Sequence, residues 1–429
     1  MKILAIETSA DDTGIAILQA KKVGSTTEFK ILANKIHTQI DIHTDYGGIF
    51  PMLAKREHGK NIVPTIVAAL KEAKMFKLDR NKKIDEKLNT KIKKILEREN
   101  DVSNIFIEIL SKLKKPEIDA IAVTVGPGLE PALWVGISIA KTLSLIWDIP
   151  IIPVNHMEGH MLSILVEKKK TFTFRKDTLQ FPMLSLLVSG GHTELVLVKE
   201  FGKYKIIGST RDDAAGEAFD KVARMLGLPY PGGPEISRLA KEEREVERKY
   251  IVSGRLAQAD GPSRENFHQE IIRADRNNIL SETNSITLPR PMIHSKDFDF
   301  SFSGLKTAVL YMIRDLPSGT FNDEMKSKIA REFEDAVVEV LTKKTMKAIN
   351  KYKIKTLVVG GGVSANIHLQ ETLRTTSKKL DPKIKVHFPT KTLSTDNALM
   401  IAIAGYFGYQ KKKPNKTNTN LRAKGNLSL

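Results

Sequence analysis

Two histidines in the segment HMEGH have the spacing of a metal site. His156 and His160 lie four residues apart, so on a helix they share one face and can hold one ion through their imidazoles. The alternative is a pair that shares a surface by coincidence. The chain has no cysteine, which excludes disulfides, thiolate metal sites, iron–sulfur clusters and a thiol nucleophile. A third metal ligand would therefore be a carboxylate.

The same segment differs from the metalloprotease motif. In that motif a glutamate directly follows the first histidine, whereas here Met157 takes that place and Glu158 comes one residue later. Glu158 is then about 200° around the helix from His156, at 3.6 residues per turn. It should point away from the metal and cannot activate water there, so group transfer is favoured over proteolysis.

Polar turns between apolar runs supply further candidate groups. Residues 3–18 and 183–198 both read as strand, tight turn and strand, and an offset of 180 superimposes Ser9 on Ser189. This repeated strand–turn–strand pattern predicts two related lobes whose turns face a common cleft. In the first turn, Asp11 and its neighbour Asp12 could hold a cation or act as a general base, or simply cap the turn.

Glycine-rich loops in three places could approach a ligand. Ser189-Gly190-Gly191 suits backbone amides that cradle a phosphate, or a plain hairpin turn. Residues 360–362 lead from a predicted strand into a helix, which fits anion binding or a tight turn. Residues 212–226 predict a helix in which Asp220 faces either solvent or the cleft, and residues 231–234 form a Pro-Gly-Gly-Pro turn.

Charge favours a polyanionic partner, since 68 Lys and Arg against 50 Asp and Glu give a net charge of +18. Residues 71–115 carry 14 basic against 8 acidic residues and predict a helical hairpin with one buried and one basic face. Residues 241–287 read as an irregular, mobile insertion, and 411–429 as a basic, disordered tail. The hairpin is the first candidate for nucleic-acid contact and the tail the second, although solvated charge runs have the same composition.

Nothing in the sequence predicts a membrane segment or a targeting signal. The chain opens on a strand-like run, and its most apolar stretch, residues 132–147, is shorter than the roughly 20 residues that a membrane span needs. We therefore expect a cytoplasmic protein with no membrane partner.

Ten motifs in order resemble the TsaD family, of the bacterial type. The chain has them as ETSADDTGIAI, TDYGGIFP, GPGLEPALWVG, HMEGH, LLVSGGHTEL, DDAAGEAFDKVARMLGLPYPGGP, DFSFSGLKTA, REFEDAVVEVL, GGGVSAN and STDNALMIA. The resemblance implies the duplicated, two-lobed α/β fold of actin, sugar kinases and heat-shock ATPases, with a cleft between the lobes. Lobe I would span residues 1–160 and be completed by 396–410, and lobe II would span 161–395.

The resemblance also implies the site residues. It makes His156, His160 and Asp396 the ligands of one divalent ion, iron or zinc, and it allows magnesium with the nucleotide. It makes Asp11 the best candidate for the general base. The chain departs from the family pattern at two positions. It has Ala10 where members often have Cys, and Asp12 where they often have Glu. Nucleotide contacts carry over to Leu187, Val188, Ser189, Gly190, Gly191, Asp220, Gly233 and Asn366.

The implied activity is transfer of threonylcarbamoyl from threonylcarbamoyl-adenylate to the N6 amine of the adenosine beside the anticodon of ANN-reading tRNAs, with release of AMP. TsaB-like and TsaE-like proteins would be partners. A nucleotide-gated, actin-like scaffold is the alternative, and the metal triad counts against it because a scaffold needs no Lewis acid.

Overall fold

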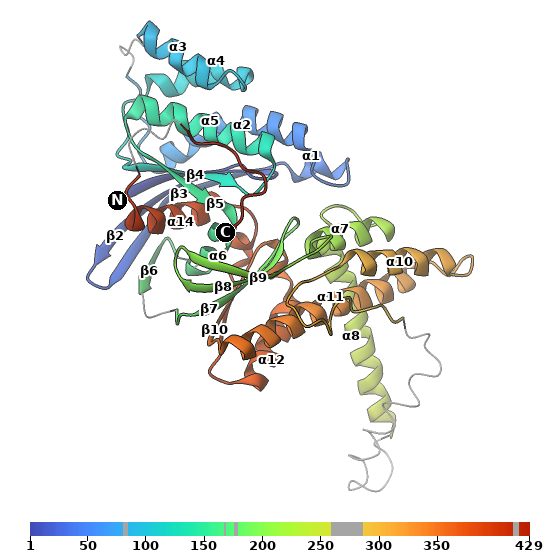
Figure 1. Ribbon diagram of the computed structural model, residues 1–429. Coiled ribbons are helices and arrows are strands. Elements are labelled where there is room, and N and C mark those ends of the chain that lie inside the picture. The colour runs from blue at the N-terminus through green and yellow to red at the C-terminus, as the bar shows by residue number, and fades with distance from the viewer. Residues whose placement is uncertain (80–84, 167–168, 176–178, 259–285, 415–419) are drawn as a thin grey trace.

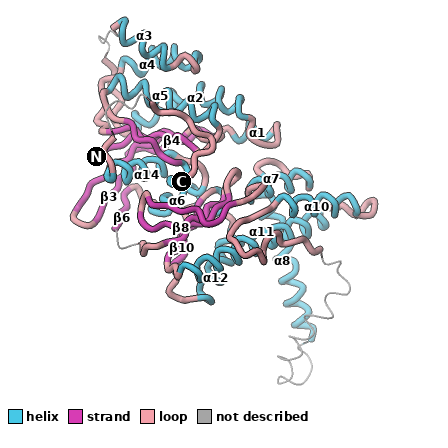
Figure 2. Tube along the Cα trace, viewed as in Figure 1, coloured by secondary structure: helices cyan, strands magenta, loops and turns pink. Residues whose placement is uncertain are grey.

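The computed structural model describes residues 1–429 except 80–84, 167–168, 176–178, 259–285 and 415–419. Two β-sheets with helices around them make up the described part (Figures 1 and 2). The strands are β1 (Lys2–Glu7), β2 (Asp12–Val23), β3 (Thr26–Thr38), β4 (Ala120–Gly126), β5 (Ile151–Asn155), β6 (Thr171–Arg175), β7 (Met183–Val188), β8 (Thr193–Glu200), β9 (Lys203–Ser209), β10 (Thr356–Gly360) and β11 (Lys385–His387). The helices are α1 (Ile40–Thr44), α2 (Pro51–Glu72), α3 (Glu86–Ile95), α4 (Asn100–Ile109), α5 (Glu130–Trp147), α6 (His156–Leu162), α7 (Ala215–Met225), α8 (Gly232–Gln258), α10 (Ser303–Asp315), α11 (Asp323–Tyr352), α12 (Ile367–Leu380), α13 (Lys391–Ser394) and α14 (Ala398–Lys411).

The two sheets share one topology. The strand order is β5-β4-β1-β2-β3-β6 in the first sheet and β11-β10-β7-β8-β9 in the second. In each sheet three successive strands are antiparallel, and the next two along the chain add in parallel at the edge of the first of the three. Strands β1 and β7 thus occupy equivalent places, and the predicted duplicated fold is confirmed.

The side chains of β1 point alternately to the two faces of the first sheet, and both sets are packed against helices. Leu4 and Ile6 pack into a core with α2 and α5, whereas Ile3 and Ala5 pack into a second core with α6 and α14. Successive side chains of a strand point to opposite faces, so a strand buried on both faces is apolar throughout. The second core also takes in Leu187 of β7. Helices α6 and α14 therefore lie between the two sheets (Figure 2).

Two features differ from the predicted boundaries. Strand β6 pairs with β3 and extends the first sheet, although the boundary expected at residue 160 assigned it to lobe II. Residues 241–258 continue α8, so the prediction of an irregular insertion was wrong there, and 259–285 lie outside the described residues. The helix persists because Arg244 bonds Glu334 and Asp335 of α11, each at 2.6 Å, and Glu247 bonds Arg331 of the same helix.

The prediction of a disordered basic tail is the third that the structure corrects. Residues 415–419 lie outside the described part, but 420–429 pack on lobe I, with Leu421 and Ala423 buried. The Lys424 amide donates to Val125 O at 2.8 Å, and the Gly128 amide donates to Gly425 O at 3.0 Å. Gly126 has φ +143°, and a Cβ there would lie 1.9 Å from Lys424 O, so a side chain at 126 would displace the tail. The buried side chains of Leu421 and Ala423, which alternate with exposed cations, anchor this segment.

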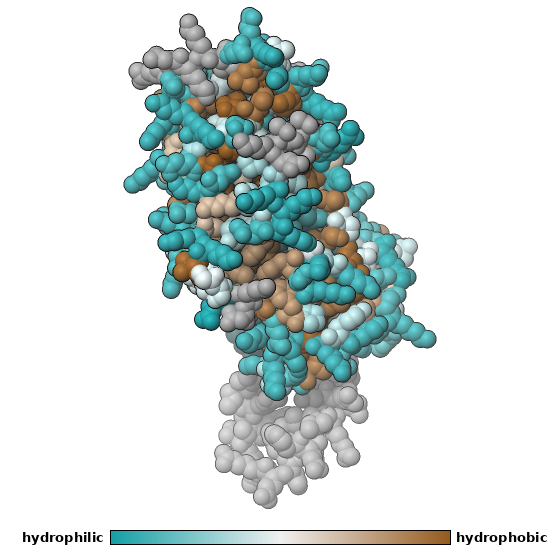
Figure 3. Space-filling model, turned by 60° about the vertical axis from the view of Figure 1, so that its left-hand side comes forward, coloured by the Kyte–Doolittle hydropathy of each residue, from teal (hydrophilic) through white to brown (hydrophobic). Residues whose placement is uncertain are grey.

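The helical hairpin predicted within residues 71–115 and the mostly hydrophilic surface are both as the composition predicts. Helices α3 and α4 bury Ile92, Leu96 and Phe106 and leave lysines exposed, which is the expected hairpin. Figure 3 shows hydrophilic side chains over most of one face, with hydrophobic ones gathered in patches. Among the described residues, no helix is both long enough and apolar enough to cross a bilayer.

Candidate metal and nucleotide site

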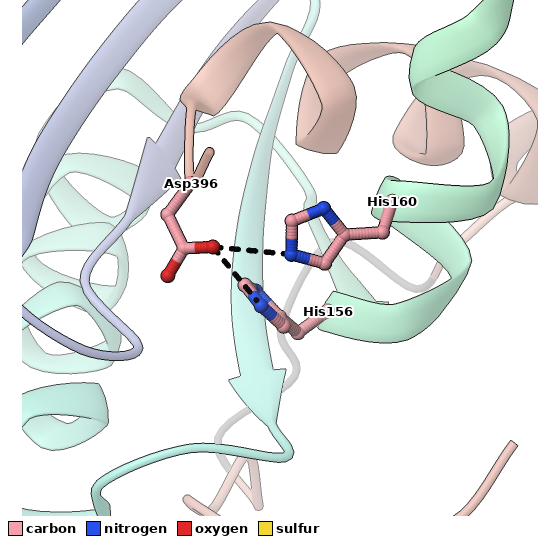
Figure 4. Close-up of side chains that lie close together, drawn as sticks. All are labelled: His156, His160 and Asp396. Carbon is pink, nitrogen blue, oxygen red and sulfur yellow. Dashed lines mark hydrogen bonds and ion pairs between the residues drawn. The ribbon is translucent and has the colours of Figure 1, made fainter. Parts of the chain in front are cut away.

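Two helix starts bring three possible metal ligands together. Asn155 caps α6 by accepting hydrogen bonds from the Met157 and Glu158 amides, and this fixes His156 and His160 on one face of the first turns. Asp396 directly precedes Asn397, which caps α14 through the Met400 amide. Asp396 Oδ1 lies 3.4 Å from His156 Nε2 and 3.1 Å from His160 Nε2 (Figure 4).

This donor set fits a divalent ion. One ligand atom from each of His156, His160 and Asp396 lies within 4.8 Å of the others. Both histidines are buried, and the Asp396 side chain keeps 19% exposure, so the cluster can be reached from solvent. Two imidazoles with one carboxylate are the ligands of catalytic zinc and of non-haem iron sites that keep positions open for substrate.

The charges in the cluster depend on one another. Burial opposes a proton on His156, but the carboxylates of Asp396 and Glu7 outweigh burial and raise its pKa to about 10. Burial and the charge of His156 lower the pKa of His160. Burial opposes ionisation of Asp396, yet the two imidazoles hold its pKa well below the usual range. A cation that binds here must displace the proton of His156.

Glu7 is a functional residue that the sequence analysis missed. This fully buried carboxylate ends β1, where the Ser9 amide donates to its Oε1 at 2.6 Å and the Thr124 hydroxyl bonds its Oε2. Its Oε2 lies 3.4 Å from His156 Nδ1, the ring nitrogen away from Asp396. A carboxylate on the distal nitrogen orients a ligating imidazole and raises its basicity. Its place beside a predicted turn was the only sequence signal.

Glu7→Gln should therefore weaken metal binding without removing it. The amide keeps the size of the side chain but loses the negative charge facing His156 Nδ1. We expect about 10- to 100-fold weaker metal affinity, the usual loss when such an outer partner is changed. Competition with a chelator of known affinity measures this change, and circular dichroism checks the fold. An unchanged metal affinity in a folded variant would show that Glu7 does not contribute to metal binding.

The first hairpin turn places Asp11 near the cluster. Burial, and then the charge of Asp396, raise the pKa of Asp11 to about 6, and burial with the charges of Asp11 and Asp396 raises that of Asp12 to about 7. His58 of α2 holds this turn. Its Nδ1 lies 2.7 Å from Thr13 Oγ1, and its Nε2 lies 2.9 Å from Ala10 O. No sequence pattern connected His58 with the turn.

The second hairpin turn faces the same cluster. A Cβ on Gly190 or Gly191 would meet nothing within 4 Å, so the turn borders open space on the side where side chains would project. Burial, and then the charges of His156 and His160, lower the pKa of His192 to about 4, which places this turn within electrostatic reach of the trio. Its position beside two glycines could have drawn attention to His192. Leu187 and Val188 are buried and offer at most their backbone.

The other predicted nucleotide contacts divide into two kinds. Asp220 Oδ1 accepts the Gly232 amide at 2.8 Å, and its charge acts on Asp11, so it faces the first lobe. A Cβ on Gly233 would meet nothing within 4 Å. Asn366 instead caps α12 at the Leu369 amide and donates to Glu334 and Ser237. Its side chain is engaged within lobe II.

Glu158 lies apart from the cluster. Its carboxylate accepts a hydrogen bond from the Tyr204 hydroxyl. Burial, which is partly offset by that hydrogen bond, raises its pKa. The group that a metalloprotease would use as its base is thus held by β9, so the geometry disfavours proteolysis.

Two lobes of one topology, with a His–His–carboxylate cluster beside their paired hairpin turns, define an actin-like protein equipped to hold a metal. The sequence model of TsaD, described as tRNA N6-adenosine threonylcarbamoyltransferase, matches residues 30–81, 102–263 and 269–403. Proteins with that name from Chromobacterium violaceum and Persephonella marina are 39% and 38% identical to this chain. The alignments cover 94% and 95% of this chain and 92% and 90% of the relatives. The chain belongs to the TsaD family.

Proposed function

We propose that this protein transfers the threonylcarbamoyl group of threonylcarbamoyl-adenylate to the N6 amine of the adenosine beside the anticodon of ANN-reading tRNAs, and releases AMP. The observation that carries the proposal is the cluster of His156, His160 and Asp396 beside two hairpin turns, within a chain of this family. The names of the relatives support the substrate class. The reaction takes place in the cytoplasm with TsaB-like and TsaE-like partners.

The donor is a mixed anhydride, which fixes the bonds that change. The adenosine N6 attacks the carbamoyl carbon, the bond from that carbon to the phosphate oxygen breaks, and AMP leaves with the electron pair. The Gly190 and Gly191 amides, in a turn where an added Cβ would meet nothing within 4 Å, would hold the phosphate of the donor. A divalent ion on His156, His160 and Asp396 would supply Lewis-acid polarisation and neutralise donor charge.

Asp11 accepts the proton that N6 releases. A general base works best when its pKa lies near the operating pH, and burial brings this carboxyl to about 6. Asp220 and Tyr230 lie within electrostatic reach of Asp11 from the second lobe, so the substrate adenosine would be enclosed by both lobes.

Analysis of cellular tRNA tests the function directly. Cells depleted of this protein should lose threonylcarbamoyladenosine from their ANN-reading tRNAs, as measured by mass spectrometry of digested tRNA. Expression of the wild-type chain should restore it, whereas the His156→Ala chain should not. Full modification after depletion would overturn the proposal.

Gly233→Val should weaken binding of an adenine nucleotide. A Cβ at 233 would enter open space near Asp220, where we place the ligand. The larger side chain should therefore meet the nucleotide without disturbing the fold. We expect at least a tenfold rise in the dissociation constant, about 1.4 kcal/mol, by calorimetry. Gly304→Val is the matched control, because Gly304 is the second residue of α10 as Gly233 is of α8, and a Cβ there would also meet nothing within 4 Å. Equal nucleotide affinity in a folded Gly233→Val protein would contradict this placement.

A further inference from the structure

Three cations from separate parts of the chain gather on the outer side of lobe I. Arg98, between α3 and α4, has its Cζ 4.8 Å from the ring centroid of Trp134 on α5. Lys141, two turns further along α5, has its Nζ 5.4 Å from the same centroid. Arg422 of the tail is close enough to act on the charge of Lys141.

Packing holds these cations in place. Leu421 and Ala423 are buried on either side of Arg422, and in this extended segment the side chains alternate, so Arg422 and Lys424 both face solvent. The indole of Trp134 fixes Arg98 and Lys141 through cation–π contacts. The nearby carboxylate of Glu130 accepts the indole N–H at 3.4 Å.

Carboxylates of the described residues do not pair directly with these three cations. Among the described residues, Arg98, Lys141 and Arg422 form no ion pair. Burial, followed by repulsion from Arg422 and Arg98, lowers the pKa of Lys141. Like charges held together repel until an anion binds among them, and guanidinium and ammonium groups together are typical of phosphate contacts.

The tail connects this cluster to the metal ligands. It passes along Val125 and Gly128, and Ser428 O accepts a hydrogen bond at 3.3 Å from the side-chain Nδ2 of Asn155, directly before His156. Figure 1 shows its red trace crossing lobe I near α5 and ending by α6. The tail thus joins the segment that carries Arg422 to the start of α6.

We propose that Arg98, Lys141 and Arg422 bind the phosphate backbone of the substrate tRNA, and that Trp134 holds two of these cations in position. The ligand follows from the proposed function, on which this inference rests. Two cations and one carboxylate already contact the indole, so the surface contacts phosphates rather than stacking bases. It therefore contributes affinity without reading the sequence.

The double variant Arg98→Gln/Arg422→Gln tests the surface. Both side chains are exposed, so the fold should persist, and unchanged metal content and nucleotide affinity check this. We expect about tenfold weaker binding of unmodified ANN-reading tRNA at ~0.1 M salt. The salt slope should shrink by about 1.5, because each neutralised phosphate contributes roughly 0.7 to 0.9.

Lys378→Gln/Lys379→Gln is the matched control, since it removes two exposed charges from α12 in the other lobe. It should leave affinity and slope within about twofold of wild type. Three results would contradict the assignment of this surface to tRNA binding. They are an equal loss of affinity in the control, an unchanged affinity of the Arg98→Gln/Arg422→Gln protein, and no tRNA binding by the wild-type chain. If depletion leaves the modified nucleoside intact while the surface variant loses tRNA binding, the proposed function fails and the surface stands. If depletion abolishes the nucleoside and the variant binds normally, the reverse holds.

Discussion

Replacing His156 with alanine should abolish both metal binding and transfer. The variant leaves one imidazole and one carboxylate, and Glu7, which faces His156 Nδ1 at 3.4 Å, loses the group that it orients. We expect less than about a tenth of the wild-type metal content by elemental analysis, and transfer reduced by about 10³-fold or more, the loss of several kcal/mol of electrostatic stabilisation. The measured product is AMP released in the presence of tRNA.

Glu158→Gln is the control for this experiment because it lies on the same helix. Its carboxylate bonds Tyr204 and not the ligand cluster, and the amide has almost the same size. This protein should keep its metal and most of its activity. Retention of full metal content by His156→Ala would overturn the ligand assignment, and metal loss in both variants would show that damage to α6, not loss of a ligand, is responsible.

Local sequence patterns predicted the elements that hold the site. The spacing of His156 and His160 was interpreted on a helix, which the structure shows beginning after the Asn155 cap, and the similarity of the two hairpins follows from apolar runs around short polar turns. The topology of each sheet then brings both turns to the same place. The third ligand, Asp396, was reached only through resemblance, because no spacing rule connects it with His160, 236 residues away, or with His156.

The partners of these residues could not be predicted in the same way. Glu7 reads as the last residue of a strand, and its relation to His156 arises only when β1, β4 and β5 lie in one sheet. His58 reads as one polar position of a helix, although it bonds both sides of the Asp11 turn. The tail was mispredicted because its charges outweigh Leu421 and Ala423 in composition, whereas two buried side chains and three backbone or amide hydrogen bonds suffice to anchor it.

The proposed reaction divides the tasks between the two lobes. Lobe I would supply the metal ligands, the base and the surface for the tRNA backbone, and lobe II would supply the turn of Gly190 and Gly191 and the groups around Asp220. Since α6 and α14 share one apolar core with β7, a change in the packing of either lobe should alter the geometry of the metal ligands.

Asp11→Asn should remove the acidic limb of the pH profile of transfer. A carboxyl acts as a base only when it is ionised, so with a pKa raised to about 6 the rate of the wild-type enzyme should fall about tenfold per unit below pH 6 and level off above it. Burial is the larger cause of this shift and remains when a cation offsets the charge of Asp396, so the limb should stay above the usual range of aspartate. The asparagine variant should be slower by about 10²- to 10⁴-fold at neutral pH and nearly independent of pH between 5 and 8, about the range in which this base would titrate.

Asp12→Asn provides the matched comparison, because it makes the same change at the neighbouring position of the same turn. If Asp11 is the base, this variant keeps a limb near pH 6, and tRNA and metal binding in both variants should match the wild-type protein. A limb that stays in Asp11→Asn, or a wild-type limb near pH 7 that disappears in Asp12→Asn, would assign the proton transfer to Asp12, whose pKa burial and the charge of Asp11 raise to about 7. The position of the limb and the variant that removes it therefore identify which carboxylate of the turn takes the proton from the adenosine amine.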